Sequence, residues 1–268
     1  MSDVEITDWD DAYANGAHIE GAGDYPPRWL REAQAFRDAR TESELDIAYG
    51  VSERQKLDLF YPKGRPKGLV VFIHGGYWLR FDKSYWSHLA EGSLASGWAV
   101  CLPGYDLAPK VRIAEITSQI GKAVTKAASM VEGPLRLTGH SAGGHLVTRM
   151  ICEDTPLDGS VVDRIENIVS ISGVHDLRPL LRTSMNQSFQ MTETDAMAES
   201  PALKRKISDC SVTAWVGQEE RPEFLRQSRI LAEAWQHTVY REDPGRHHFD
   251  VIDGLKDKDS ELTSLLVG

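Results

Sequence analysis

Residues 134–146 read PLRLTGHSAGGHL and combine a short apolar strand, a sharp turn and the start of a helix. The turn contains Gly139-His140-Ser141-Ala142-Gly143, a G-x-S-x-G pattern. Glycines two positions before and after the serine let strand and helix approach without Cβ clashes, while the serine occupies a strained apex. Because the helix begins at the serine, its free N–H groups face any negative charge that develops there. The pattern predicts that Ser141 is a nucleophile lifted clear of its neighbours.

Strand-like and helix-like patterns alternate through most of the chain. The clearest strand is the apolar run 68–73, GLVVFI, which is typical of a strand buried on both faces. We expect strands at 45–49, 55–61, 68–73, 98–102, 135–138, 165–172, 211–216 and 237–240. We expect helices at 27–40, 84–96, 112–131, 144–151, 176–182 and 222–235, and a closing helix that opens at 248. The alternation predicts an α/β fold with a mostly parallel central sheet, helices on both faces, and a site beyond the carboxyl ends of the strands.

The organisation of the chain indicates a single domain over residues 1–268, a length that suits one large α/β unit. Residues 1–45 are largely polar and form, in our interpretation, an N-terminal arm packed on this domain. The arm either roofs the active site or serves as a structural strap. Residues 183–206 are polar, and we expect an irregular excursion over the sheet edge there.

Composition excludes several classes of protein. Thirty Lys and Arg against 40 Asp and Glu give a formal charge of −10, so we expect neither nucleic acid nor a membrane as a partner. The opening residues MSDVE are acidic where a signal peptide is basic, and no apolar run approaches membrane-spanning length. The three cysteines, at 101, 152 and 210, lack metal-ligand or redox-pair spacing. They indicate buried thiols in a reducing compartment, and hence a cytoplasmic protein.

The motif HGGYW at 74–78 follows the strand at 68–73. Its glycines let backbone N–H groups turn inward to hold an anionic oxygen, although a plain glycine turn is the alternative. The sequence does not decide which amides point inward; we favour Gly76 and Tyr77, with Ala142 from the G-x-S-x-G turn. The residues that we predict to contact the substrate are Gly75, Trp78 and His140. The rings of Tyr77 and Trp78 could stack on an aromatic group, and core packing is the alternative for both.

A base and an acid are expected near the C-terminus. His248 follows the turn at 243–245 after the last strand, where a loop would carry a base; His247 is a less favoured substitute, and a surface histidine is the alternative for either. Glu219 and Glu220 end the preceding strand, and a carboxylate there would fix the tautomer of the histidine and stabilise the imidazolium. Either glutamate could instead be a favourable charge at a helix N-terminus.

These motifs resemble the α/β-hydrolase superfamily, and within it the kynurenine formamidase (arylformamidase) branch and the neighbouring HGG-type esterases. The matching pieces are HGGYW at 74–78, YDLAP at 105–109, GHSAGG at 139–144, ERPEF at 220–224, RQS at 226–228 and HF at 248–249. The order Ser141, Glu220, His248 is the order of this fold. The resemblance places the acid two residues before Pro222, on Glu220, where formamidases usually carry Asp followed by Ser.

The resemblance implies a serine hydrolase that cleaves a small amide or ester through an acyl-enzyme, with no metal or organic cofactor. An N-formyl arylamine such as formylkynurenine is the leading substrate, and a short-chain carboxylesterase or a catabolic amidase is the alternative. A non-catalytic binding protein of the same fold ranks low, because serine, acid and histidine are all present. The acidity and size of the chain are compatible with a homodimer, for which the sequence names no interface.

Overall fold

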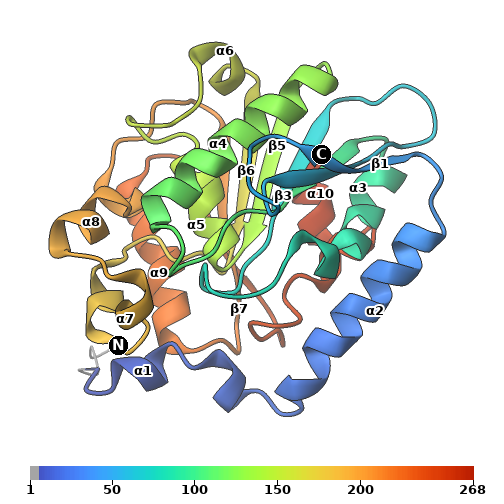
Figure 1. Ribbon diagram of the computed structural model, residues 1–268. Helices are drawn as coiled ribbons and strands as arrows, with labels where there is room; N and C mark the ends of the chain where they lie inside the picture. Colours follow the sequence, from blue (N-terminus) through green and yellow to red (C-terminus); the bar gives the residue numbers. More distant parts are fainter. Residues whose placement is uncertain (1–5) are drawn as a thin grey trace.

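The computed structural model describes residues 6–268, whose strands form one eight-stranded sheet (Figure 1). The order along the sheet is β1-β2-β4-β3-β5-β6-β7-β8. The strands are Ser43–Ala48 (β1), Lys56–Phe60 (β2), Leu69–Ile73 (β3), Ala99–Pro103 (β4), Leu135–His140 (β5), Ile165–Ile171 (β6), Ser211–Gly217 (β7) and Thr238–Asp243 (β8). Strands β3 to β8 run parallel, whereas β2 is antiparallel to both β1 and β4. The predicted α/β class with a mostly parallel sheet is confirmed.

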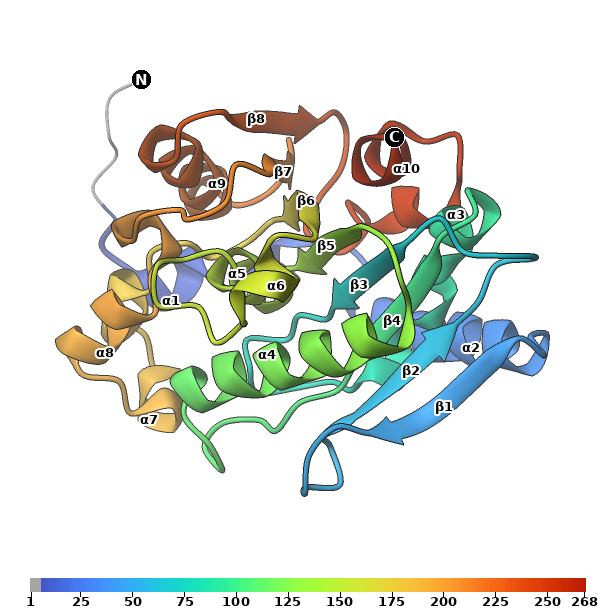
Figure 2. The same ribbon diagram turned by 90° about the horizontal axis from the view of Figure 1, so that it is seen from above.

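Helices cover both faces of the sheet (Figures 1 and 2). They are Trp9–Ala12 (α1), Tyr25–Asp38 (α2), Glu91–Ala95 (α3), Ile113–Met130 (α4), Ala142–Arg149 (α5), Gly159–Val162 (α6), Asn186–Phe189 (α7), Glu193–Ala198 (α8), Pro222–Ala234 (α9) and Glu261–Val267 (α10). Alternate residues of β3 divide between two apolar cores: Val71 packs with side chains of α4, α5 and α9, and Val70 packs with side chains of α2, α3 and α10. This alternation is what a strand buried on both faces produces.

Helix α4 illustrates how the sequence pattern becomes packing. Its apolar residues recur every three or four positions and lie on one stripe of the helix. The stripe, which is buried as the sequence predicts, comprises Ile113, Ile116, Ile120, Val124 and Ala127. The carboxylate of Glu115 accepts a hydrogen bond from the amide of Arg112 at 2.8 Å, which satisfies one of the free N–H groups at the helix start.

Four expected elements differ from the structure. The helix predicted over 84–96 is replaced by two 3-10 turns, Lys83–Tyr85 and Ser87–Ala90, followed by the short α3. The side chain of Asp82 caps the first of these turns by accepting from the amide of Ser84, and the indole of Trp86 then turns into the core. The helix predicted over 176–182 is likewise only a 3-10 turn, Arg178–Arg182.

Two further differences lie near the site. The closing helix does not open at 248: residues after it form turns, a 3-10 turn Asp253–Lys256 follows, and α10 starts only after Ser260, whose hydroxyl caps it. The segment 183–206 is not irregular, since it contains α7 and α8. A reciprocal cap between Thr192 and Asp195 stabilises the start of α8, a signal that the polar composition concealed.

The N-terminal segment runs along one end of the sheet, from α1 through 3-10 turns at Asn15–His18 and Ala22–Asp24 into the long α2 (Figure 1). Two of its aromatic side chains are buried: Tyr13 packs with the core that contains α9, and Trp29 with the core that contains α3. All three cysteines are buried and unpaired, as predicted. Within residues 6–268, no helix is both long and apolar enough to cross a bilayer.

Candidate active site

Ser141 stands at the turn between β5 and α5 with φ 56° and ψ −117°, a strained conformation for a residue with a side chain. The flanking glycines make this turn feasible. A Cβ on Gly143 would lie 1.9 Å from the carbonyl oxygen of Ile73, and a Cβ on Gly139 would lie 2.3 Å from that of Gly143. The predicted reason for the glycine spacing is confirmed. The turn therefore holds Ser141 just beyond the carboxyl end of β5.

Glu220 and His248 come from the loops after β7 and β8, and they meet through a hydrogen bond of 2.6 Å between Oε2 and Nδ1. Because a carboxylate can only accept, the imidazole proton lies on Nδ1 and Nε2 is left to accept a proton. The other carboxylate oxygen, Oε1, accepts from the amide of Gly217 at 2.8 Å and from the hydroxyl of Ser172. Glu220 is only 7% exposed, so these contacts fix one orientation of the carboxylate.

The neighbours that the sequence offered as substitutes face elsewhere. Glu219 is exposed, and its amide donates to the carbonyl oxygen of Arg246. The ring of His247 turns toward the N-terminal segment, where its Nε2 lies 3.0 Å from the hydroxyl of Tyr25. The structure thus pairs His248 with Glu220 and directs Glu219 and His247 away from that pair.

The loop after β3 brings a second set of backbone groups to the same place. Gly76 has φ 105° and Tyr77 has φ 54°, so this loop turns sharply through the left-handed region that favours glycine. Within residues 6–268, the amides of Gly76, Tyr77 and Ala142 donate no hydrogen bond to another protein group. Gly76 and Tyr77 line the same cavity as Ser141, and Ala142 begins α5 beside it. These free donors are what an oxyanion hole requires.

His140 lines this cavity, but its ring is already engaged. Its Nε2–H donates to the carbonyl oxygen of His248 at 2.8 Å, and the two imidazole rings lie 4.6 Å apart. Burial lowers the pKa of His140 well below its usual value, and the neighbouring His248 lowers it further. His140 therefore stays neutral and holds the backbone of His248 in place, a contact that the sequence did not predict.

Two of the residues predicted to contact the substrate, Trp78 and Gly75, do not line the cavity. Trp78 is fully buried, and its ring packs edge-on against His145 and Phe189 at 5.1 and 5.8 Å, away from the cavity. Gly75 lies behind Ser141: a Cβ there would come within 2.9 Å of the Ser141 Cβ. Its role is to let the loop and the serine turn pack closely. Of the alternatives left open for Trp78, core packing is the correct one.

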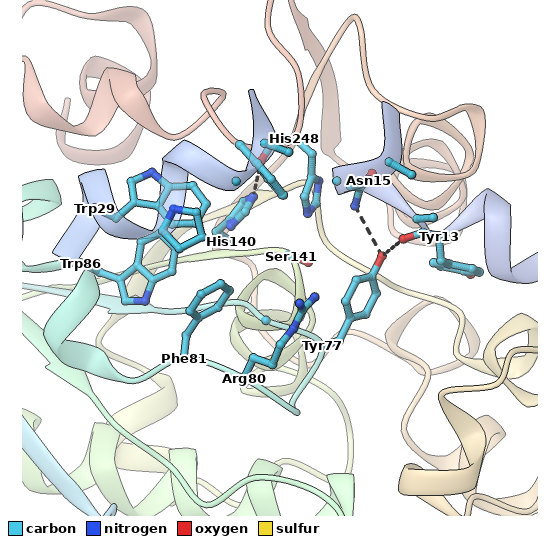
Figure 3. A pocket seen from close by; sticks show the side chains of 18 residues that line it. Tyr13, Asn15, Trp29, Tyr77, Arg80, Phe81, Trp86, His140, Ser141 and His248 are labelled. Carbon is cyan, nitrogen blue, oxygen red and sulfur yellow. Dashed lines mark hydrogen bonds between the residues drawn. The ribbon is translucent and has the colours of Figure 1, made fainter. Parts of the chain in front are cut away.

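Ser141 and His248 open into a cavity of about 360 Å³ that is lined by aromatic rings and small residues (Figure 3). Several of its lining side chains were not predicted from the sequence: Tyr13, Asn15, Trp29, Arg80, Phe81, Trp86 and Phe249. Figure 3 shows the rings of Trp29, Trp86 and Phe81 gathered on one side of Ser141, and Tyr77 and Tyr13 on the other. Apolar residues in the sequence do not reveal whether they face a core or a cavity, and only their position after HGGYW could have indicated Arg80 and Phe81.

The N-terminal segment provides half of this cavity and is bonded to the segments that follow β3 and β7. The hydroxyl of Tyr13 donates to Glu223 at 2.7 Å, and its carbonyl oxygen accepts from the hydroxyl of Tyr77 at 2.6 Å. Arg221, which directly follows Glu220, forms an ion pair with Asp11. Between the roles left open for the arm, roof or strap, the cavity lining favours the roof.

Residues 57–229 match the sequence model of the BD-FAE family. Kynurenine formamidase of Salmo salar is 34% identical over 253 residues, which cover 89% of this chain and 85% of that protein. Kynurenine formamidase of Danio rerio is 34% identical over 242 residues, covering 85% and 82%.

Solved structures give the same fold. A protein of Silicibacter sp. TM1040, provisionally described as a thioesterase, has a TM-score of 0.95 and 52% sequence identity over 97% of this chain and 99% of its own. Esterase B from Lactobacillus rhamnosis has a TM-score of 0.66 at 18% identity over 97% of this chain and 92% of its own, a likeness of fold alone.

The fold and the site define an α/β-hydrolase of the arylformamidase and esterase type, an enzyme that hydrolyses amides or esters. The chain belongs to the BD-FAE family and is a homologue of the kynurenine formamidases.

Proposed function

We propose that the protein is a serine hydrolase of small aryl amides, with N-formyl arylamines of the N-formylkynurenine type as its substrates. The observation that carries this proposal is that Ser141 and His248 line the same cavity, which also contains aromatic rings, and that His248 is hydrogen-bonded to Glu220. The vertebrate relatives named kynurenine formamidases, identical at 34% over most of the chain, support the choice of a formyl amide. A cavity of about 360 Å³ lies at the small end of the usual range for ligand sites and suits one substituted aromatic ring.

In the first half of the proposed reaction, the hydroxyl oxygen of Ser141 attacks the carbonyl carbon and passes its proton to Nε2 of His248. Glu220 stabilises the imidazolium that forms through its hydrogen bond to Nδ1. The amides of Gly76, Tyr77 and Ala142 hold the oxyanion of the tetrahedral intermediate. His248 then returns the proton to the leaving nitrogen, the C–N bond breaks, and the arylamine departs.

In the second half, water attacks the formyl ester on Ser141 while His248 takes its proton. Collapse of the second tetrahedral intermediate releases formate and restores the serine hydroxyl. A formyl group carries no carbon beyond its carbonyl, so the acyl side of the site needs almost no room. The rings of Trp29, Phe81 and Trp86 are then available to the aryl group.

The hydrolysis of short acyl esters or thioesters is the second candidate. It is favoured by the similar Silicibacter protein, which is provisionally described as a thioesterase and is 52% identical to this chain. The catalytic residues would be the same, and the acyl side of the pocket would have to accept more than a hydrogen atom. The two candidates therefore differ in how activity depends on acyl length.

One assay panel on the purified protein separates them: N-formylkynurenine, formanilide, and aryl esters and thioesters of increasing acyl length. We expect kcat/KM to peak on the formyl amides and Ser141→Ala to lose at least about 10⁴-fold in kcat. Ser160→Ala, on an exposed serine of α6, is the matched control and should retain wild-type rates. A peak on acetyl or butyryl esters with inert formamides would replace the formamidase proposal by the esterase one, and turnover by Ser141→Ala would overturn the mechanism.

For the protein as a whole, we propose one catalytic domain, with the N-terminal arm as part of its active site, working in the cytoplasm. The single eight-stranded sheet and the three unpaired, buried cysteines support this proposal. Light scattering on the purified protein tests the homodimer that size and acidity allow.

A further inference from the structure

The side chain of Arg80 carries a permanent charge in a cavity that is otherwise neutral, apart from its histidines. Among the described residues that line the cavity, Arg80 alone belongs to the four charged types Lys, Arg, Asp and Glu. The rest of the lining consists of aromatic rings, small residues, Pro26, Asn15, Ser141 and two histidines. The proposed mechanism assigns no task to this guanidinium.

Arg80 also lacks an anionic partner. No carboxylate of residues 6–268 lies within 4.0 Å of its guanidinium, and no described acceptor takes a hydrogen bond from it. Other arginines nearby are used by the fold: Arg54 donates to the carbonyl oxygens of Tyr105 and Phe81, and Arg221 pairs with Asp11. Since the chain carries ten more acidic than basic residues, the unpaired state of Arg80 does not reflect a shortage of carboxylates.

The backbone that carries Arg80 is held in a fixed, strained form. Non-glycine residues at 77, 78 and 81 all have φ between 54° and 72°, a conformation that costs of order 1–3 kcal/mol each and persists where surroundings enforce it. The amide of Arg80 donates to the carbonyl oxygen of Gly76 at 3.0 Å, and the loop is anchored through the hydroxyl of Tyr77 and the carbonyl of Phe81. In Figure 3 the side chain of Arg80 extends between Phe81 and Tyr77 toward Ser141.

We propose that Arg80 binds a carboxylate of the substrate and thereby makes the enzyme selective for anionic aryl amides; this inference rests on the proposed function. A guanidinium presents parallel N–H donors that match the two oxygens of a carboxylate. The aromatic walls hold the aryl ring, the amides near Ser141 hold the reacting carbonyl, and Arg80 receives the acidic substituent. Arg80 is exposed before the substrate binds, so its charge carries little desolvation cost. The bound substrate then covers the ion pair.

The test compares formanilides that carry a carboxylate at the ortho, meta or para position with the corresponding neutral carboxamides. We expect the wild-type enzyme to prefer at least one carboxylate over its carboxamide. Arg80→Gln should lower that preference about tenfold, chiefly through KM, which corresponds to the loss of one charge-assisted contact. Arg80→Lys should restore part of it, since the charge remains while the paired donors are lost. Arg65→Gln, at an exposed arginine paired with Glu132, is the matched control and should leave the preference unchanged.

A second measurement does not depend on formamide hydrolysis. Aminobenzoates and aminobenzamides compete with a neutral phenyl ester for the same cavity, and their inhibition constants report the carboxylate preference directly. If formanilides are inert but Arg80→Gln still removes a preference for aminobenzoate, the proposed function fails and the role of Arg80 stands. If the wild-type enzyme shows no carboxylate preference in either assay, or if Arg80→Gln and Arg80→Lys both retain it, the role of Arg80 is refuted.

Discussion

Replacing Glu220 with glutamine changes one atom of the carboxylate that faces His248, and the contacts of that carboxylate dictate how the new amide must lie. Oε1 accepts a hydrogen bond from the amide of Gly217 at 2.8 Å. A side-chain NH₂ in this position would face another N–H donor, so the amide oxygen of glutamine must remain there. The NH₂ group then occupies the position of Oε2, 2.6 Å from Nδ1 of His248.

This orientation of the glutamine amide reverses the tautomer of His248. The NH₂ group donates to Nδ1, so the single imidazole proton moves to Nε2, the nitrogen that has to accept the proton of Ser141. The equivalent change of acid to amide in a serine protease keeps the geometry and lowers kcat by about 10⁴. We expect a loss of the same size in Glu220→Gln, or about 5.5 kcal/mol of activation free energy. Because shape and hydrogen-bond number are kept, thermal stability should change much less than activity.

The assay is kcat at neutral pH on the best substrate of the panel, with thermal unfolding as a check of the fold. Glu219→Gln is the matched control: it removes the same charge from the neighbouring, exposed residue and should retain wild-type kcat within about twofold. A Glu220→Gln enzyme within tenfold of wild type would refute the assignment of the acid. A larger loss in Glu219→Gln than in Glu220→Gln would refute the pairing that the structure displays.

Two predictions concern stability. Burial lowers the pKa of His74, His88 and His175 to about 4, whereas the same histidines in the unfolded chain take up a proton near pH 6.5. Between pH 6.5 and 4 the unfolded state therefore binds more protons than the folded state. As the pH is lowered through this range, the free energy of unfolding should fall by up to about 1.4 kcal/mol per pH unit for each histidine. Urea unfolding at pH 7, 5.5 and 4.5 measures this slope, which His88→Gln should flatten by about one proton; a slope of zero contradicts the argument. Gly143→Ala should lower Tm by about 6 °C or more, since its Cβ would lie 1.9 Å from the carbonyl oxygen of Ile73. Gly159→Ala, where an added Cβ meets no described atom within 4 Å, should leave Tm nearly unchanged, and equal effects of the two would disprove the packing argument.

The arrangement of the proposed catalytic residues could be anticipated because each of them directly follows a strand. Parallel strands end at the same edge of a sheet, so groups placed just after β3, β5, β7 and β8 come together however the intervening helices are arranged. Glu220 and His248 are 28 residues apart in the chain and 2.6 Å apart at their side chains for this reason. The sequence offered two carboxylates and two histidines; the resemblance favoured Glu220, the position after the turn favoured His248, and the structure pairs these two side chains.

The pocket walls could not be anticipated in the same way. The rings of Trp29 and Trp86 lie 4.7 Å apart, yet they come from the N-terminal arm and from a loop after β3. Nothing local in either segment specifies that contact. An apolar side chain on a helix face has the same pattern whether it meets a core or a cavity, and Trp78, expected beside the substrate, proved to be core. Charge was equally uninformative, since an arginine in a loop is ordinarily solvated.

The departure of this chain from the usual formamidase pattern after β7 has a physical explanation in the arm. Where formamidases usually carry Asp and Ser, this chain has Glu220 and Arg221. Glu220 reaches His248 at 2.6 Å, so its extra methylene is accommodated and the acid–base contact is kept. Arg221 pairs with Asp11, whose pKa is lowered by the hydrogen bond from His18 and by Arg221 itself. The substitution therefore changes how the N-terminal arm is attached, through Arg221 and Asp11, and leaves the contact between Glu220 and His248 in place. Differences of substrate between this protein and its relatives should accordingly be sought in the arm and in the loop at 76–81, which both line the cavity, and not among the proposed catalytic residues.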